Sequence, residues 1–60
     1  MVIAVKNKKA VAINGNIIVR SYGNKKAITA YPQGDSVVVN HVDGSVMEYR
    51  MKDGIVLRKH

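Results

Sequence analysis

The chain has 60 residues, with ten Lys or Arg against four Asp or Glu, so its formal net charge is +6. It contains no cysteine, which excludes disulfide cross-links and the common cysteine zinc sites. A chain of this length buries only about 60% of its unfolded surface. Phe and Trp are absent, so the core must be built mostly from Val, Ile and Ala, and such a thin core favours homo-oligomerisation.

Short apolar runs separated by turn residues predict seven β-strands. We expect no helix, because no segment keeps a 3.6-residue apolar period. The expected strands are 2–6, 10–13, 16–22, 25–31, 36–42, 45–51 and 55–59. The regular spacing of the turns is typical of an antiparallel meander. We therefore predict one all-β domain over residues 1–60, either a small barrel of the SH3 or OB kind or a dimeric β-sandwich.

The turn residues between these runs indicate how the strands connect. A turn is expected at Asn7-Lys8, and Asn14-Gly15 suits a type I′ turn because both residues tolerate positive φ. Pro32 is expected to end the fourth strand, since it cannot donate to a ladder. Asp43-Gly44 is among the strongest short hairpin signals.

The turns at 52–54 and at Gly23-Asn24 set the expected pairing registers of the strands on either side of them. A three-residue loop over 52–54 places Glu48 opposite Arg58 and separates apolar from charged side chains. It assigns to the core Met47, Tyr49, Met51, Ile55 and Leu57. A two-residue turn at Gly23-Asn24 pairs the third expected strand with the fourth.

That second register gathers a basic face with aromatic residues on it. Its members are Lys9, Arg20, Tyr22, Lys25 and Tyr31. Bases stack on tyrosine rings while neighbouring cations hold phosphates, so this face is the candidate nucleic-acid site. Arg20, Lys9 and Lys25 are expected to contact phosphate, with Tyr22 and Tyr31 stacking. The alternative is that both tyrosines cap a core and the cations are merely solvated.

Further cations stand at turns and at the C-terminal end of the sequence. Lys6 with Lys8-Lys9, and Lys25-Lys26, could clamp phosphates or an acidic protein surface, or could protect strand edges from aggregation. The segment 58–60 could contact phosphate or be a frayed end.

The sequence offers little for catalysis, metals or cofactors. Asp35, His41 and Ser45 have the residue types of a triad, but nothing in their spacing positions them. No third ligand accompanies a histidine at metal-site spacing, and no glycine-rich phosphate loop is present. We expect no enzymatic activity, no metal and no cofactor. The apolar run 1–5 is too short for a signal peptide or a membrane span, so no membrane contact and a cytoplasmic location are expected.

Two functions remain after these exclusions. The favoured one is a small, non-enzymatic nucleic-acid-binding protein that uses the basic face, since a positive field favours polyanions through counterion release. The rival is a protein-interaction or assembly module, such as a regulator or inhibitor from a virus or mobile element or a subunit of a β-rich oligomer. In that case the positive charge would mainly guide the approach of the protein partner.

Overall fold

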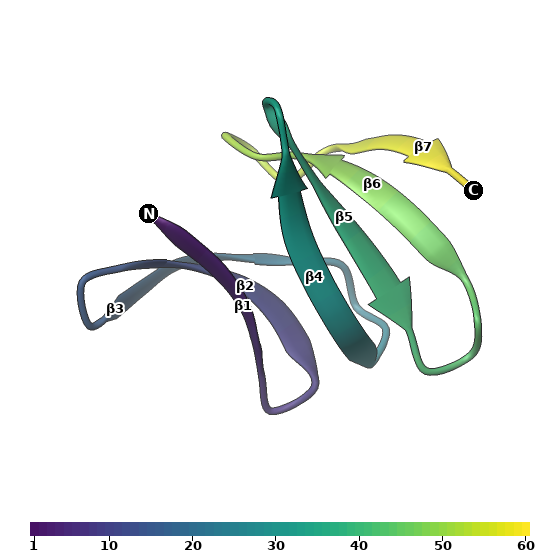
Figure 1. The fold of residues 1–60 in the computed structure, drawn as a ribbon, viewed down its shortest axis with the longest axis horizontal. Coiled ribbons are helices and arrows are strands. Elements are labelled where there is room, and N and C mark those ends of the chain that lie inside the picture. The colour runs from purple at the N-terminus through teal and green to yellow at the C-terminus, as the bar shows by residue number, and fades with distance from the viewer.

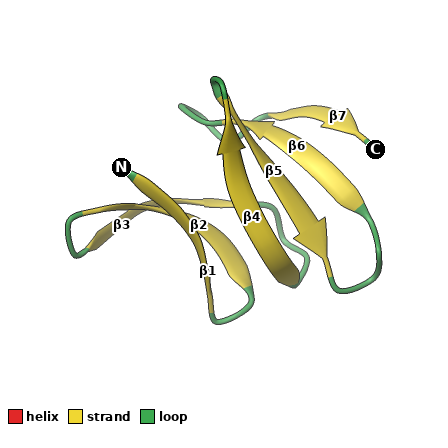
Figure 2. Cartoon of the chain, viewed as in Figure 1, coloured by secondary structure: helices red, strands yellow, loops and turns green.

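The computed structural model describes residues 1–60 and consists of seven strands joined by short turns (Figures 1 and 2). The strands are β1 (Val2–Lys6), β2 (Lys9–Asn14), β3 (Ile17–Tyr22), β4 (Ala27–Gln33), β5 (Ser36–His41), β6 (Val46–Arg50) and β7 (Val56–Lys59). The all-β fold and the seven expected strands are confirmed. The structure holds no helix long and apolar enough to cross a membrane.

The strands form two antiparallel sheets rather than one closed barrel. Sheet A has the order β1-β2-β3, and sheet B has the order β4-β5-β6-β7. The outer strands β1 and β4 lie side by side (Figure 1). One backbone hydrogen bond joins the sheets at a corner, from Ala27 N to the Lys8 carbonyl, at 2.7 Å. The expected barrel is therefore not found.

The predicted hairpin at Gly23-Asn24 is wrong, because the chain forms two separate sheets and this turn lies between them. Strands β3 and β4 belong to different sheets and do not pair. Residues 23–26 instead carry the chain from sheet A to sheet B, and the Lys26 carbonyl accepts a hydrogen bond from the Val42 N–H at 2.9 Å. A tight turn signal cannot distinguish a hairpin from a crossing between sheets, because both need only a local reversal of the chain.

One core lies between the two sheets and is built from small aliphatic side chains around two tyrosines. Its buried members are Ala10, Ala12, Tyr22, Ala27, Val37, Val39 and Tyr49. The rings of Tyr22 and Tyr49 lie 6.0 Å apart at an interplanar angle of 41°. The Tyr22 hydroxyl donates to the Met51 carbonyl at 2.7 Å. This bond ties sheet A to the β6–β7 turn and satisfies the buried phenol, as burial of a tyrosine requires.

The β6–β7 register agrees with the sequence prediction at one end only. Glu48 lies opposite Arg58 as predicted, but the register shifts and Tyr49 pairs with Val56. The shift leaves one extra residue, Leu57, on β7, as in a β-bulge. Tyr49 is buried and both predicted core methionines are half-buried, whereas Ile55 and Leu57 are 52% and 48% exposed. Their predicted place in the core is wrong, because the bulge turns β7 away from it.

Two further turns differ in detail from expectation. Strand β4 continues through Pro32 to Gln33, so Pro32 does not end it. Proline is tolerated there because β4 is the outer strand of sheet B. A hairpin does join β2 to β3, but its turn residues are Gly15 and Asn16, because Asn14 pairs with Ile17, and the predicted type I′ turn at Asn14-Gly15 is wrong. The register also shifts at Ala12/Ile13, so Arg20 faces Ala12 instead of Lys9.

Candidate nucleic-acid interface

Five lysines from two turns meet at one end of the two sheets, at the lower edge of Figure 1, beside a third turn that carries Asp43. We call this region the lysine end, and its members are Lys6, Lys8, Lys9, Lys25 and Lys26. Lys6 and Lys9 face each other across the β1–β2 hairpin. The Lys8 carbonyl accepts the Ala27 N–H, which brings residue 8 beside Lys26. The backbone thus holds together lysines that lie about 17 residues apart in the sequence.

The lysine end carries most of the net charge of the chain. Its five lysines stand against one carboxylate, Asp43, which leaves four of the six net positive charges there. Only Lys25 is paired, with its Nζ 3.3 Å from Asp43 Oδ2. The other four lysines form no ion pair and are exposed. Unpaired cations on adjacent turns produce a focused positive field, which attracts polyanions.

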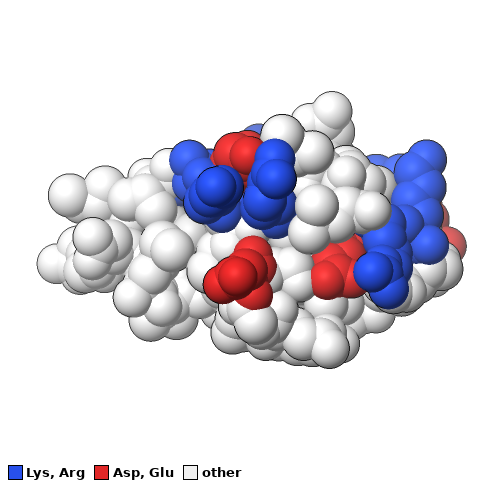
Figure 3. Space-filling view, turned by 90° about the horizontal axis from the view of Figure 1, so that it is seen from above, with Lys and Arg blue, Asp and Glu red and all other residues white.

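The opposite side of the molecule has a different charge pattern. Figure 3, seen from above, shows Lys and Arg in separate groups with carboxylates beside them. Arg50 Nη2 lies 2.8 Å from Asp53 Oδ2, and Arg58 Nε lies 3.6 Å from Glu48 Oε1. Guanidinium groups that are already paired have less charge to offer an anion, so the lysine end is the stronger candidate.

Lys8 occupies a strained position at the tip of the β1–β2 turn. Asn7 and Lys8 have φ of 51° and 62°, the geometry of a type I′ turn, and they are the only non-glycine residues with positive φ. Glycine is the usual second residue of such a turn, because a left-handed backbone opposes a Cβ. Strain of this kind is concentrated at functional sites, so the presence of lysine here supports a role for its charge.

Replacing Lys8 by Gly is expected to stabilise the fold by about 0.5–1 kcal/mol, because it relieves the left-handed strain. The same change removes one cation from the lysine end and should weaken binding to a duplex. Urea unfolding followed by circular dichroism measures the stability. Lys8→Gln is the matched control, since it removes the charge and keeps the Cβ. A less stable Lys8→Gly chain would contradict the assigned turn strain.

The structure divides the predicted basic face into three parts. Lys9 and Lys25 both belong to the lysine end. Tyr22 lies in the core with 1% of its surface exposed, so its predicted availability for base stacking is wrong. Arg20 is half-buried and lies against the β6–β7 turn at Gly54. Tyr31 is 48% exposed and points to the outer side of sheet B, opposite Val38.

The sequence shows both lysine clusters but not that they meet. Lys6, Lys8 and Lys26 are therefore missing from the predicted site. Their proximity depends on the hydrogen bond between residue 27 and residue 8, which crosses from one sheet to the other. The one signal in the sequence was that all five lysines flank turns, since turns at the same end of a stacked pair of sheets lie close together.

The β5–β6 turn beside the lysine end holds a small polar network. The Ser45 hydroxyl donates to Asp43 Oδ1 at 2.6 Å, and the Ser45 N–H donates to the same oxygen at 2.9 Å. His41 Nδ1 lies 3.2 Å from Ser45 Oγ. Since the only hydroxyl proton of Ser45 goes to the carboxylate, His41 Nδ1 must be the donor. The buried His41 Nε2 then has no partner.

This network differs from a catalytic triad in its order. In a triad the carboxylate orients the histidine and the histidine accepts the serine proton. Here the carboxylate binds the serine directly, and His41 is 1% exposed. Asp35, the acidic residue among the three that the sequence offered as a possible triad, lies elsewhere, in the β4–β5 turn. Its backbone carbonyl accepts a hydrogen bond from the Met51 N–H there. The network therefore fixes the turn that presents Asp43 to Lys25.

Three carboxylates, two in turns and one on strand β6, have a lowered pKa. Hydrogen bonds from the Ser45 hydroxyl and N–H hold the pKa of Asp43 far below its ordinary value, and Lys25 adds to the effect. The Ser36 hydroxyl lowers the pKa of Glu48, and the Arg50 guanidinium lowers that of Asp53. In each case the folded protein favours the ionised form. These groups contribute stability above the unfolded pKa and lose it as the pH falls through the folded pKa.

The melting temperature is therefore expected to stay level from pH 7 to about 5 and to fall below about pH 4, where unfolded carboxyls begin to bind protons. Thermal unfolding between pH 2 and 7 measures this. Asp43→Asn should reduce the acid loss, whereas Asp35→Asn should not, because the Asp35 side chain forms no ion pair. Stability that rises on acidification would contradict the assigned hydrogen bonds.

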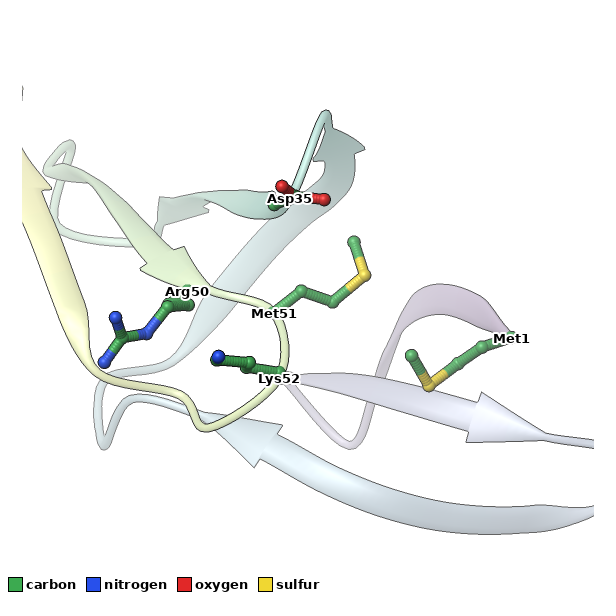
Figure 4. Close-up of a pocket in the computed structure, with 5 residues that line it drawn as sticks. All are labelled: Met1, Asp35, Arg50, Met51 and Lys52. Atoms are coloured by element: carbon green, nitrogen blue, oxygen red, sulfur yellow. The ribbon is translucent and has the colours of Figure 1, made fainter.

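A pocket of about 320 Å³ opens beside the β6–β7 turn (Figure 4). Two methionines, Met1 and Met51, line it together with Asp35, Arg50 and Lys52. Arg50 is already bound to Asp53, so few free polar groups converge there. No three His, Asp or Glu side chains lie close enough together to hold a metal ion. The lysine end is thus the best-supported site.

Comparison with known proteins gives no relative from which a function could be transferred: no family model, curated protein or solved structure matches this chain significantly.

Proposed function

We propose that this protein is a small, non-enzymatic nucleic-acid-binding protein that contacts the phosphate backbone through the lysine end. The observation that carries the proposal is the meeting of five lysines and one carboxylate on three adjacent turns. Lys9 and Lys25, predicted from the sequence, are joined there by Lys6, Lys8 and Lys26. No metal or cofactor has a role in this proposal.

The composition of the lysine end favours backbone contact over base recognition. No aromatic side chain is exposed among its residues, since Tyr22 is buried and Tyr31 lies on the outer side of sheet B. Lysine binds phosphate as a flexible point charge and carries no base-specific geometry. The whole molecule measures 30 × 23 × 15 Å, which is less than one turn of duplex, about 34 Å. Few phosphates are within reach, so micromolar affinity without strong sequence preference is expected.

Titration of a fluorescent 20-base-pair duplex at several salt concentrations tests the proposal. If all five lysines contact phosphate, log K should fall with log salt with a slope of about −4.5. Two unrelated duplex sequences should bind about equally. Tyr31→Ala should leave the affinity unchanged if stacking has no part. If the protein does not bind the duplex at about 20 mM salt, the proposed function is wrong.

A second candidate, an assembly module, is supported by a different observation. Large apolar side chains stay exposed on strands of both sheets, among them Val2, Ile17, Ile18, Ile28, Ile55 and Leu57. Apolar side chains that lie next to one another on a protein surface are typical of protein contacts. Of the finer architectures predicted from the sequence, the dimeric β-sandwich is the one that two open sheets support, and we retain it as a proposal.

A further inference from the structure

The one ion pair at the lysine end joins Lys25 to Asp43, and the strand register brings the two residues together. Strands β4 and β5 pair along their length. Beyond their last pair the ladder continues by one step, because the Val42 N–H donates to the Lys26 carbonyl at 2.9 Å. The next positions along the two segments are 25 and 43, so these side chains meet as a cross-strand pair does. Lys25 Nζ lies 3.3 Å from Asp43 Oδ2.

The Asp43 carboxylate is held in this place from its other side. Its Oδ1 accepts the Ser45 hydroxyl at 2.6 Å and the Ser45 N–H at 2.9 Å. These bonds hold the pKa of Asp43 well below its ordinary value, so the group is ionised at neutral pH. One carboxylate oxygen thus binds the turn, and the other faces the lysine. Asp43 is therefore a fixed anion among five cations.

The same residues line a pocket, which we call the Lys25–Lys26 pocket. It has a volume of about 310 Å³ and lies where the segment that joins the sheets meets the β5–β6 turn, at the lower edge of Figure 1. Its lining residues are Lys25, Lys26, Val42 and Asp43. Lysine ammonium groups bind phosphate oxygens through charge-assisted hydrogen bonds. Two lysines in one pocket therefore suit a phosphate group, and Asp43 is the one lining group that repels it.

We propose that the Lys25–Lys26 pocket receives one backbone phosphate of the bound nucleic acid, and that Asp43 competes with this phosphate for Lys25. The inference rests on the proposed function, since it names a phosphate subsite within the lysine end and the residue that limits its affinity. A carboxylate oxygen and a phosphate oxygen are both anionic acceptors for the same ammonium group. On binding, Lys25 leaves Asp43 and contacts the phosphate, so all five lysines become available.

The exposure of the ion pair sets the size of the effect. The two side chains are 53% and 54% exposed. An exposed ion pair changes an equilibrium constant by about fivefold at most, so Asp43 lowers the affinity of the pocket and does not block it. Removing the carboxylate frees Lys25 and also removes a repulsive charge. Together these changes should tighten binding by about three- to fivefold.

Titration of the same fluorescent duplex at about 0.1 M salt tests the competition. Asp43→Asn should raise the affinity by about three- to fivefold, because asparagine keeps an acceptor oxygen for Ser45 and releases Lys25. In a Lys25→Gln chain the same change should raise the affinity by less than about twofold, since no ion pair is left to break. Circular dichroism verifies that each variant is folded.

The matched control is Asp35→Asn, which removes one carboxylate from the β4–β5 turn, at the opposite end of β5 from Asp43. It should raise the affinity for the duplex by less than about twofold, because only the long-range field changes.

A small anion tests the pocket without nucleic acid. Pyrophosphate, titrated into the ¹⁵N-labelled chain, should shift most strongly the backbone amide signals of residues 25–26 and 42–43. The concentration at half-saturation should fall by about three- to fivefold in Asp43→Asn. Shifts spread evenly over all the lysine-bearing turns would overturn the proposed pocket.

Failure of this inference can be told apart from failure of the proposed function. If the parent binds the duplex and Asp43→Asn gains no more than Asp35→Asn, the competition is wrong and the nucleic-acid function stands. An undiminished gain in the Lys25→Gln chain also contradicts the competition for Lys25. If Asp43→Asn tightens pyrophosphate binding in the pocket but no chain binds the duplex, the phosphate pocket and its competitor stand and the nucleic-acid function is wrong.

Discussion

Replacing Lys8, Lys9 and Lys26 together by Gln is expected to weaken binding to a DNA duplex by about two orders of magnitude at 0.1 M salt. Each lysine that neutralises a phosphate releases a counterion, and the released ions supply most of the affinity. Removing three of five contacts should also reduce the slope of log K against log salt from about −4.5 to about −1.8. Fluorescence anisotropy at four salt concentrations measures both quantities.

The matched control removes the same number of charges elsewhere. Lys52, Arg58 and Lys59 lie outside the lysine end, so their joint replacement by Gln lowers the net charge equally. Only the long-range field should then weaken, with less than about a tenfold loss and a nearly unchanged slope. Equal losses in the two triple variants would show that binding follows net charge and has no defined site.

The lysine variants should remain folded, which separates this experiment from a test of stability. All three positions are exposed and make no ion pair. Lys8→Gln keeps the strain of the turn, and Lys9 and Lys26 contribute to the fold through their backbone. Exposed substitutions of this kind change stability by about 0.5 kcal/mol or less.

Replacing Gly23 by Ala is expected to remove most of the stability of the fold. Gly23 has φ of +78°, and a Cβ placed there would lie closer to the Tyr49 hydroxyl than van der Waals contact allows, so one of the two groups would have to move. The left-handed backbone alone costs about 1–2 kcal/mol, and overpacking adds about 1–3 kcal/mol. A core of this size provides only about 3–5 kcal/mol.

Two variants separate the backbone effect from the steric one. Gly44 also has positive φ, at +90°, but nothing lies within 4 Å of an added Cβ. Gly44→Ala should therefore show the backbone effect alone. Adding Tyr49→Phe to Gly23→Ala removes the atom nearest the new methyl group and should restore part of the lost stability. Urea unfolding of the parent, Gly23→Ala, Tyr49→Phe and the double variant measures the coupling, and fully additive losses would contradict a direct contact.

Gly23 and Tyr49 also explain how residues 23–26 pass between the sheets instead of forming a hairpin. The Tyr49 ring closes over Gly23 at the point where the chain passes from sheet A to sheet B. A side chain at position 23 would prevent that approach. The glycine that suggested a hairpin in the sequence therefore serves a crossing between sheets.

Local sequence patterns were enough to predict the local structure of this protein. Turn residues and period-two apolar runs were sufficient for seven strands, for the hairpins at Asn7-Lys8 and Asp43-Gly44, and for Glu48 opposite Arg58, because each depends on a few neighbouring residues. The sequence also determined that the chain is basic and that its lysines stand at turns.

Which strands pair and which charges lie together depends on contacts between residues far apart in the sequence. A bulge changes the register by one position between its two sides, so Leu57 lost its predicted place opposite Tyr49 and lies outside the predicted core, although its strand was predicted correctly. The burial of Tyr22 and the meeting of Lys8 with Lys26 depend on contacts between the sheets. Such contacts join residues far apart in the chain, and no local pattern encodes them.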